Sequence, residues 1–267
     1  MMLPRLQLIE LEDLPGWPRS LRDAMTDYLQ AIIAWFDPYR PAAPLLAAAL
    51  ARAGTAQVVD LGSGGGGPWF KLGARLAGLG VRIDSITLTD AFPNAAAFAR
   101  VEQQTGGRVR GYPQPVDASG VPATLPGFRT MFTALHHFPP PAARAILTDA
   151  VRQGQGIAVF EMTTRSVLDV LGMPLFAALL FVLTPWIRPF RWTRLIWTYL
   201  VPIIPLAVLV DAVVSSLRSY TPRELRALAE AIDEGGAAGY RWEAGMVCTL
   251  LAAAPVTYLI GTPERAG

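Results

Sequence analysis

The glycine-rich run V-V-D-L-G-S-G-G-G-G-P-W, from Val58 to Trp69, is the strongest chemical signal in the sequence. Glycines between a strand and a helix let a ligand approach the backbone closely and expose amide groups at the helix start. Gly62, Gly64 and Gly67 satisfy the G-x-G-x-x-G spacing of dinucleotide-binding loops, so a nicotinamide or flavin enzyme is one interpretation. That spacing alone is a weak signal, because a glycine-rich turn is often only a turn.

Three aspartates near the ends of predicted strands favour a different ligand. Asp60 comes directly before the glycines, where a carboxylate would repel a pyrophosphate but could accept a hydrogen bond from a cationic group. Asp90 ends the next strand and is suited to bridging two ribose hydroxyls, while Asp117 could accept a hydrogen bond from an adenine amino group. A ligand with one ribose, one adenine and an ammonium but no phosphate fits this set. Each aspartate could instead serve only as a cap or loop residue.

The stretch from about Thr55 to Thr163 resembles the class I S-adenosylmethionine-dependent methyltransferases. D-L-G-S-G-G-G resembles their glycine motif, T-L-T-D their acidic second-strand end, P-V-D-A their adenine-contacting motif and F-T-A-L-H-H-F their fourth-strand motif. The resemblance implies S-adenosylmethionine as the cofactor, and its implied binding residues are Asp60, Gly62, Ser63, Gly64, Asp90, Phe92, Asp117 and Ala118. It implies that the glycine loop holds the methionine portion, Asp90 the ribose and Asp117 the adenine, with Phe92 packing on the adenine face.

His136 and His137 end the predicted fourth strand, where the resemblance places the transferred methyl group. A histidine with a pKa of about 6.5 can take the proton of a hydroxyl or carboxyl acceptor, so we expect one of the pair to be catalytic. The alternative is structural, because one of two adjacent side chains usually points away and a histidine at a strand end often bonds only backbone. Glu161, ending the predicted fifth strand, is a second candidate for which a structural contact is the alternative.

Strands alternate with helices through the middle of the chain. The predicted strands are 57–61, 85–89, 110–116, 130–135 and 156–162. A helix over 222–232 and strands over 240–247 and 255–260 follow. The alternation predicts an α/β fold with a doubly wound, mostly parallel sheet, and the resemblance implies seven strands of which the last is antiparallel.

The predicted elements divide the chain into three parts. Residues 1–54 form an N-terminal helical cap, in which apolar residues recur at helical spacing from about Pro18 to Ala53. Residues 55–163 and 218–267 form the cofactor-binding methyltransferase domain. Residues 164–217 form an apolar helical insert that departs from the family pattern.

The insert contains two uncharged runs, 170–187 and 195–210, joined by R-P-F-R-W-T-R. As helices they would measure about 27 Å and 24 Å, slightly less than a hydrocarbon core of about 30 Å. A spanning hairpin would also export the three arginines at its tip, against the positive-inside tendency. We therefore expect a membrane-surface element with Arg188, Arg191 and Arg194 at the lipid headgroups, or an apolar lid or dimer element, rather than a spanning hairpin.

The composition excludes several other classes. Hydrophobic residues make up 52% of the 267 residues and charged residues only 16%, below a usual share of about 25%. A net charge of +2 without a basic run argues against nucleic-acid binding. The single cysteine, Cys248, excludes an intrachain disulfide, and with two histidines we expect no metal site. Glu10, Glu12 and Asp13 lie where a signal peptide needs an apolar core, so we expect a cytoplasmic protein, in part at the cytoplasmic face of the membrane.

These features together predict methyl transfer from S-adenosylmethionine to an apolar or lipid-like small molecule, at oxygen. The sequence lacks an N-P-P-Y motif, which the resemblance associates with nitrogen and nucleic-acid-base acceptors. Two alternatives stay open: a non-catalytic, membrane-associated scaffold or sensor that binds the cofactor, and a nicotinamide-dependent oxidoreductase. The oligomeric state is also left open.

Overall fold

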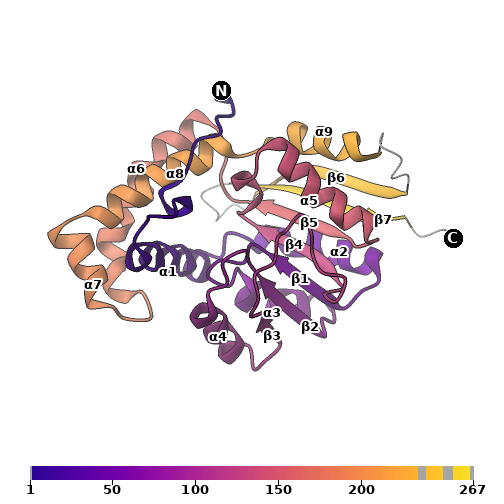
Figure 1. Cartoon of the computed structure of the whole chain (residues 1–267), viewed down its shortest axis with the longest axis horizontal. Helices are drawn as coiled ribbons and strands as arrows, with labels where there is room; N and C mark the ends of the chain where they lie inside the picture. The colour runs from indigo at the N-terminus through magenta and orange to yellow at the C-terminus, as the bar shows by residue number, and fades with distance from the viewer. Residues whose placement is uncertain (1, 234–238, 249–254, 265–267) are drawn as a thin grey trace.

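A seven-stranded sheet forms the centre of the protein in a computed structural model that describes residues 2–233, 239–248 and 255–264 (Figure 1). Its strands are β1 (Gln57–Leu61), β2 (Ser85–Thr89), β3 (Val109–Gly111), β4 (Phe128–Phe132), β5 (Ile157–Glu161), β6 (Tyr240–Val247) and β7 (Val256–Pro263). They lie in the order β3-β2-β1-β4-β5-β7-β6. β1 to β5 are parallel, whereas β7 pairs antiparallel with both β5 and β6. The predicted fold class is confirmed.

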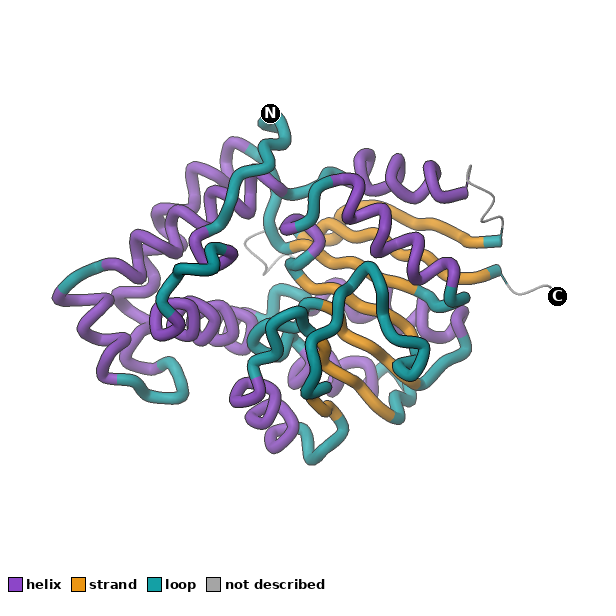
Figure 2. The backbone as a smooth tube through the Cα atoms, viewed as in Figure 1, coloured by secondary structure: helices purple, strands orange, loops and turns teal. Residues whose placement is uncertain are grey.

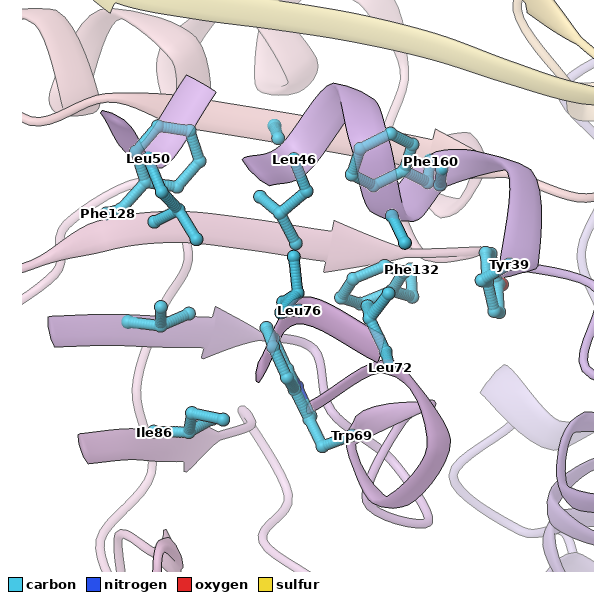
Figure 3. Packing of buried hydrophobic residues seen from close by; sticks show 14 of the residues in the cluster. Tyr39, Leu46, Leu50, Trp69, Leu72, Leu76, Ile86, Phe128, Phe132 and Phe160 are labelled. Carbon is cyan, nitrogen blue, oxygen red and sulfur yellow. The ribbon is translucent and has the colours of Figure 1, made fainter. Parts of the chain in front are cut away.

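Helices cover both faces of the sheet. One face carries α2 (Ala43–Ala53), α3 (Trp69–Gly78) and α4 (Ala95–Gln104), and the other carries α5 (Pro140–Arg152) and α9 (Pro222–Asp233). Neighbouring residues of one strand therefore enter opposite cores: Val58 joins the first cluster and Val59 the second. Figure 3 shows part of the first cluster, in which the buried Trp69 contacts Phe132 edge to face. Burial on both faces explains the continuous apolar runs of the central strands.

Two of the predicted strands end several residues earlier than predicted. β3 stops at Gly111 because Pro113 and Pro115, which follow it, have no N–H to donate to a strand ladder. β4 stops at Phe132, since Thr133 has a φ of 48°, a strained value for a β-branched residue. The chain then makes a short 3₁₀ turn, Leu135–His137. The histidines were thus predicted wrongly as a strand end, and they lie on the turn that follows.

A helical lobe lies beside the sheet, on the left in Figure 1. It consists of α1 (Arg19–Phe36), α6 (Val167–Leu183), α7 (Trp192–Leu195) and α8 (Ile203–Arg218), with a 3₁₀ turn, Thr184–Trp186, and a π-helical turn, Ile196–Leu200. α6 and α8 pack against each other, and residues of both share one apolar cluster with α1. We call Val167–Arg218 the insert hairpin.

The N-terminal segment, residues 2–14, runs between the helical lobe and the sheet (Figure 2). The backbone N–H of Leu3 donates to Arg165, and that of Leu6 donates to Leu217. Further along, the Asp211 carboxylate accepts hydrogen bonds from the N–H groups of Leu11 and Glu12. The segment is therefore fastened to the C-terminal half of α8.

The arginines of the insert are arranged differently from the prediction. Arg194 is 1% exposed, and its guanidinium donates to Asp27 of α1 and to the carbonyls of Ile187 and Pro189. Arg191 also donates to Asp27, at 2.9 Å. The placement of Arg194 at lipid headgroups was wrong, because a buried carboxylate of α1 needs a cationic partner. Of the three arginines, Arg188 is exposed.

One helical stretch, Val167–Trp186, is long and apolar enough to cross a membrane, with a mean hydropathy of 2.2. Trp192–Leu200 and Ile203–Arg218 meet the same test only as a pair that is bent by 80°.

Candidate active site

The glycine loop leaves the carboxyl end of β1 and reaches α3. Gly62 and Gly64 have φ values of 63° and 50°, in the left-handed region that glycine adopts without strain. A Cβ atom on Gly62 would lie 3.2 Å from the Cβ of Ala134, so the loop packs closely on the segment after β4. A Cβ atom on Gly64 would meet nothing within 4 Å, so the loop is open there. This open side can receive a ligand.

Asp60 lies beneath the loop and is 1% exposed. One carboxylate oxygen accepts from the Thr130 hydroxyl at 2.6 Å, and the other accepts from the Ser63 hydroxyl at 2.7 Å. Burial raises the pKa of Asp60 to about 6, although these two hydrogen bonds oppose the rise. Asp60 therefore ties β1, β4 and the loop together. Its contact with the ammonium group of a ligand stays a prediction.

Asp90 follows β2 and joins the loop from the neighbouring strand. Its Oδ2 accepts from the N–H of Gly64 at 2.9 Å, and its Oδ1 accepts from the N–H of Phe92 at 2.8 Å. The Phe92 side chain is 89% exposed. The structure thus brings the glycine loop, Asp90 and Phe92 together at one edge of the sheet.

Asp117 and Ala118 lie on a loop that returns to this edge. The N–H of Val116 donates to the carbonyl of Asp90 at 2.9 Å, which places Asp117 next to the end of β2. Asp117 is exposed, and hydrogen bonds from the backbone and the hydroxyl of Ser119 lower the pKa of its carboxyl. Ala118 is buried, so only its backbone could contact a ligand. The predicted roles of these residues stay predictions.

His136 is buried between two carboxylates. Its Nδ1 is 2.7 Å from Glu161 Oε2, and its Nε2 is 3.5 Å from Glu10 Oε1. The other oxygen of Glu161 accepts from the N–H of Leu135 at 2.8 Å. Burial alone would lower the pKa of His136, but the charges of Glu161 and Glu10 raise it to about 10. His136 is therefore an imidazolium at neutral pH that bridges two carboxylates.

His137 has an exposed edge, since 25% of its side chain is accessible. Its Nδ1 is 3.2 Å from Asp13, and its Nε2 is 3.7 Å from Glu10 Oε2. Burial would raise the pKa of Asp13, but contacts with His137 and Arg218 hold that pKa below its usual range. An ionised aspartate on Nδ1 favours the tautomer in which Nε2 can accept a proton.

The N-terminal carboxylates and Arg218 were missing from the predicted site. Arg218 Nη1 lies 2.9 Å from Asp13 Oδ2 and 3.3 Å from Glu10 Oε1, and Nη2 donates to the carbonyl of His137 at 2.7 Å. Asp13 and His137 are 124 residues apart in the sequence, so no local pattern connects them. Three acids close together in the N-terminal stretch, Glu10, Glu12 and Asp13, were the available signal.

Within the described residues, the ligand atoms of Glu10, His136 and His137 lie within 4.8 Å of one another, as in a possible metal site. The guanidinium of Arg218 is 3.3 Å from Glu10, which would place two cations side by side if a metal were bound. The same atoms form a satisfied ion-pair network without a metal. The expectation that the protein has no metal site stays a prediction.

This network predicts a dependence of stability on alkaline pH. The folded-state pKa of His136 is about 10, above its ordinary value of about 6.5. Its stabilising contribution is therefore fully present below about 6.5 and is lost as the pH rises through about 10. We expect the melting temperature of the wild type to fall more between pH 6.5 and 10 than that of a His136→Gln variant, by at least about 2–4 °C. Circular dichroism melts measure this difference, and parallel curves would contradict the assignment.

No protein-family model matches the chain, and no curated protein matches it. Solved structures do match. An O-methyltransferase family protein from Burkholderia thailandensis has a TM-score of 0.51 and 15% identity, over 92% of this chain and 60% of its own. The S-adenosylmethionine-dependent methyltransferase SibL has a TM-score of 0.51 and 18% identity, over 96% and 61%. A protein described as a zinc-dependent alcohol dehydrogenase from Rhodobacter sphaeroides has a TM-score of 0.51 and 13% identity, over 91% and 98%.

At these identities the similarity concerns the fold, and the chain spans about 60% of the length of the two methyltransferases. The strand order and the antiparallel β7 agree with what the motif resemblance implies. The chain therefore has the seven-stranded α/β fold of the class I S-adenosylmethionine-dependent methyltransferases.

Proposed function

We propose that the protein transfers a methyl group from S-adenosylmethionine to an oxygen of an apolar or lipid-like small molecule. The observation that carries this proposal is the 2.9 Å hydrogen bond from the Gly64 N–H to Asp90. It fixes an open glycine loop and a partly exposed carboxylate side by side at the carboxyl edge of the sheet, where open α/β sheets bind ligands. The O-methyltransferase from Burkholderia thailandensis with the same fold supports oxygen as the acceptor atom.

The residues at this edge suit the chemical groups of the cofactor. Gly62 and Gly64 would hold the methionine portion, Asp90 the ribose hydroxyls, and Asp117 with Phe92 the adenine. The carboxylates also suit a ligand with a net positive charge and no phosphate. When bound, S-adenosylmethionine supplies an electrophilic methyl group on a positively charged sulfur.

The acceptor side lies at the turn after β4. We assign the base to His137, because His136 is protonated at neutral pH and holds a carboxylate on each ring nitrogen. With cofactor and acceptor bound, the cofactor would supply its methyl group to the acceptor oxygen, and Nε2 of His137 would take the proton that the acceptor releases. Asp13 keeps the ring oriented and stabilises the imidazolium that forms. His136 positions its neighbour, since the two ring centroids are 4.4 Å apart.

The helical lobe and the N-terminal segment both reach the histidines. Arg218, the last residue of α8, donates to the carbonyls of both histidines, so the helical lobe reaches the acceptor side. The N-terminal segment covers the pair, and its Glu10 and Asp13 contact both rings. An acceptor that reaches His137 would therefore contact this segment.

The nicotinamide alternative is disfavoured by the position of α3. In the dinucleotide fingerprint the third glycine lets the helix pack closely on the strand. Here α3 begins at Trp69, after Gly67, so all three glycines of the motif precede the helix. Fluorescence titration with NADH tests this alternative directly.

Titration calorimetry with S-adenosylmethionine and S-adenosylhomocysteine tests the proposed cofactor, and we expect both to bind. Absence of binding for both would overturn the proposal. Transfer of a radiolabelled methyl group to a lipid extract or to hydroxylated aromatic compounds tests the enzyme activity. Cofactor binding without any transfer would favour the scaffold or sensor.

A further inference from the structure

The outward side of α6 is apolar and exposed. Leu168, Leu171, Leu175 and Val182 are 65–81% exposed, and their spacing of three, four and seven residues places them on one face of the helix. Every exposed position of α6 from 168 to 182 is apolar. Only 17% of the most apolar window of Val167–Trp186 is buried, so α6 is not a core helix of a soluble domain.

The opposite sides of α6 and α8 both pack on α1. Leu180 of α6 and Ile204 and Val208 of α8 join one buried cluster with Tyr28 of α1. Since both helices turn one side toward α1, their exposed sides point away from it together. On α8 this exposed side carries Leu206 and Val210. We call Leu168, Leu171, Leu175, Val182, Leu206 and Val210 the outer face.

The tip of the insert hairpin carries residue types that favour a membrane interface. Trp186 and Trp192 are 70% and 73% exposed, and Tyr199 is 47% exposed. Arg188 is exposed between the two tryptophans. Tryptophan and tyrosine concentrate at headgroup level in membranes, and an arginine there attracts anionic lipids.

We infer that the outer face and the tip dock on the surface of a lipid bilayer. The exposed apolar row along α6 marks a binding site rather than an ordinary protein surface. Protein interfaces of standard size contain about one hydrogen bond per 100–200 Å², whereas the exposed side of α6 offers no polar side chain over a length of about 25 Å. A hydrocarbon phase requires no hydrogen bonds and is the better match.

The hairpin lies in the plane of the membrane rather than across it. Length does not decide the orientation of α6, because the helical stretch Val167–Trp186 has 20 residues and is long enough to span. Its inner side is fastened to α1, and Asp27 of α1 holds Arg191 and Arg194 by ion pairs. The geometry matches helices that bury one apolar face in the headgroup and acyl boundary of one leaflet.

Flotation with phosphatidylcholine vesicles tests the docking, and it is measured without cofactor or acceptor, so its outcome is independent of the proposed methyl transfer. We expect the wild type to float and a Leu171→Glu/Leu175→Glu variant to partition about 100-fold more weakly, since two leucines lose their burial. Leu79→Glu, on an exposed leucine beyond α3, is the matched control and should float like the wild type. The melting temperature shows whether each variant is folded.

The tip gives a second, separable measurement. Arg188→Ala should leave binding to phosphatidylcholine unchanged and weaken binding to vesicles containing phosphatidylglycerol by about fivefold. Failure of the wild type to float on either vesicle would overturn the inference. If the wild type is instead a dimer by analytical ultracentrifugation and Leu171→Glu/Leu175→Glu makes it monomeric, a second copy of this chain covers the outer face.

Discussion

Replacing Asp90 by alanine is expected to weaken S-adenosylmethionine binding by about 100-fold or more. A hydrogen bond to a charged group contributes about 1.5–3 kcal/mol, and the carboxylate can accept from both ribose hydroxyls. The substitution also removes the acceptor for the Gly64 N–H and so releases the glycine loop. Titration calorimetry measures the loss, and an unchanged affinity would refute the assignment of Asp90 to the ribose.

Asp84→Ala is the matched control for this experiment. Asp84 directly precedes β2 at its other end, is half exposed and pairs with Arg82. Its removal should leave cofactor affinity within about twofold of the wild type, because surface ion pairs contribute little to stability. An Asp90→Asn variant separates charge from shape: if it binds like the alanine variant, the negative charge is what the ligand requires.

The cofactor side of the site could be predicted from sequence for a geometric reason. Parallel strands end at the same edge of a sheet, so residues that follow consecutive strands come together there whatever the distance along the chain. Gly64 and Asp90 illustrate this, since they are 26 residues apart and share a hydrogen bond. The motifs predict that these two residues lie close together because each motif marks the carboxyl end of a strand, β1 for Gly64 and β2 for Asp90.

The acceptor side could not be predicted in the same way. Glu10 and Asp13 contact the histidines from the N-terminal segment, which forms no strand of the sheet. No motif or spacing near these residues in the sequence predicts that contact. The buried pair of Asp27 and Arg194, 167 residues apart, is of the same kind. The sequence predicts a basic tip for the insert, whereas in the structure two of its three arginines, Arg191 and Arg194, pair with the buried carboxylate of Asp27.

The structure also shows where the excess of apolar residues lies. The apolar runs of the strands are buried on both sides of the sheet. Within the insert hairpin, α6 and α8 pack against each other and against α1. The remaining apolar surface is concentrated on α6, α8 and the tip between them. The low share of charged residues is therefore most marked on the outer face and the tip of the insert hairpin.

Replacing His137 by glutamine is expected to lower the rate of methyl transfer by about 100-fold to 10,000-fold, the usual contribution of a general base. Cofactor affinity should not change, because the ring points toward Asp13 and Glu10 rather than toward the glycine loop. The measurement is the turnover rate with a radiolabelled methyl group, with calorimetry on the same preparations. Asp13→Asn should cause a smaller loss in the same direction, since it removes the group that orients the ring.

The comparison with His136→Gln decides which histidine is the base. His136 holds a proton between Glu161 and Glu10, so its replacement should disturb the position of His137 without abolishing the basic group in the pH profile. An acceptor with an acidic hydroxyl loses its proton without assistance, and for it the His137→Gln variant should recover most of the rate. If His136→Gln loses activity and His137→Gln keeps it, the buried ring is the base, and the segment that carries Glu10 must move away from it during catalysis.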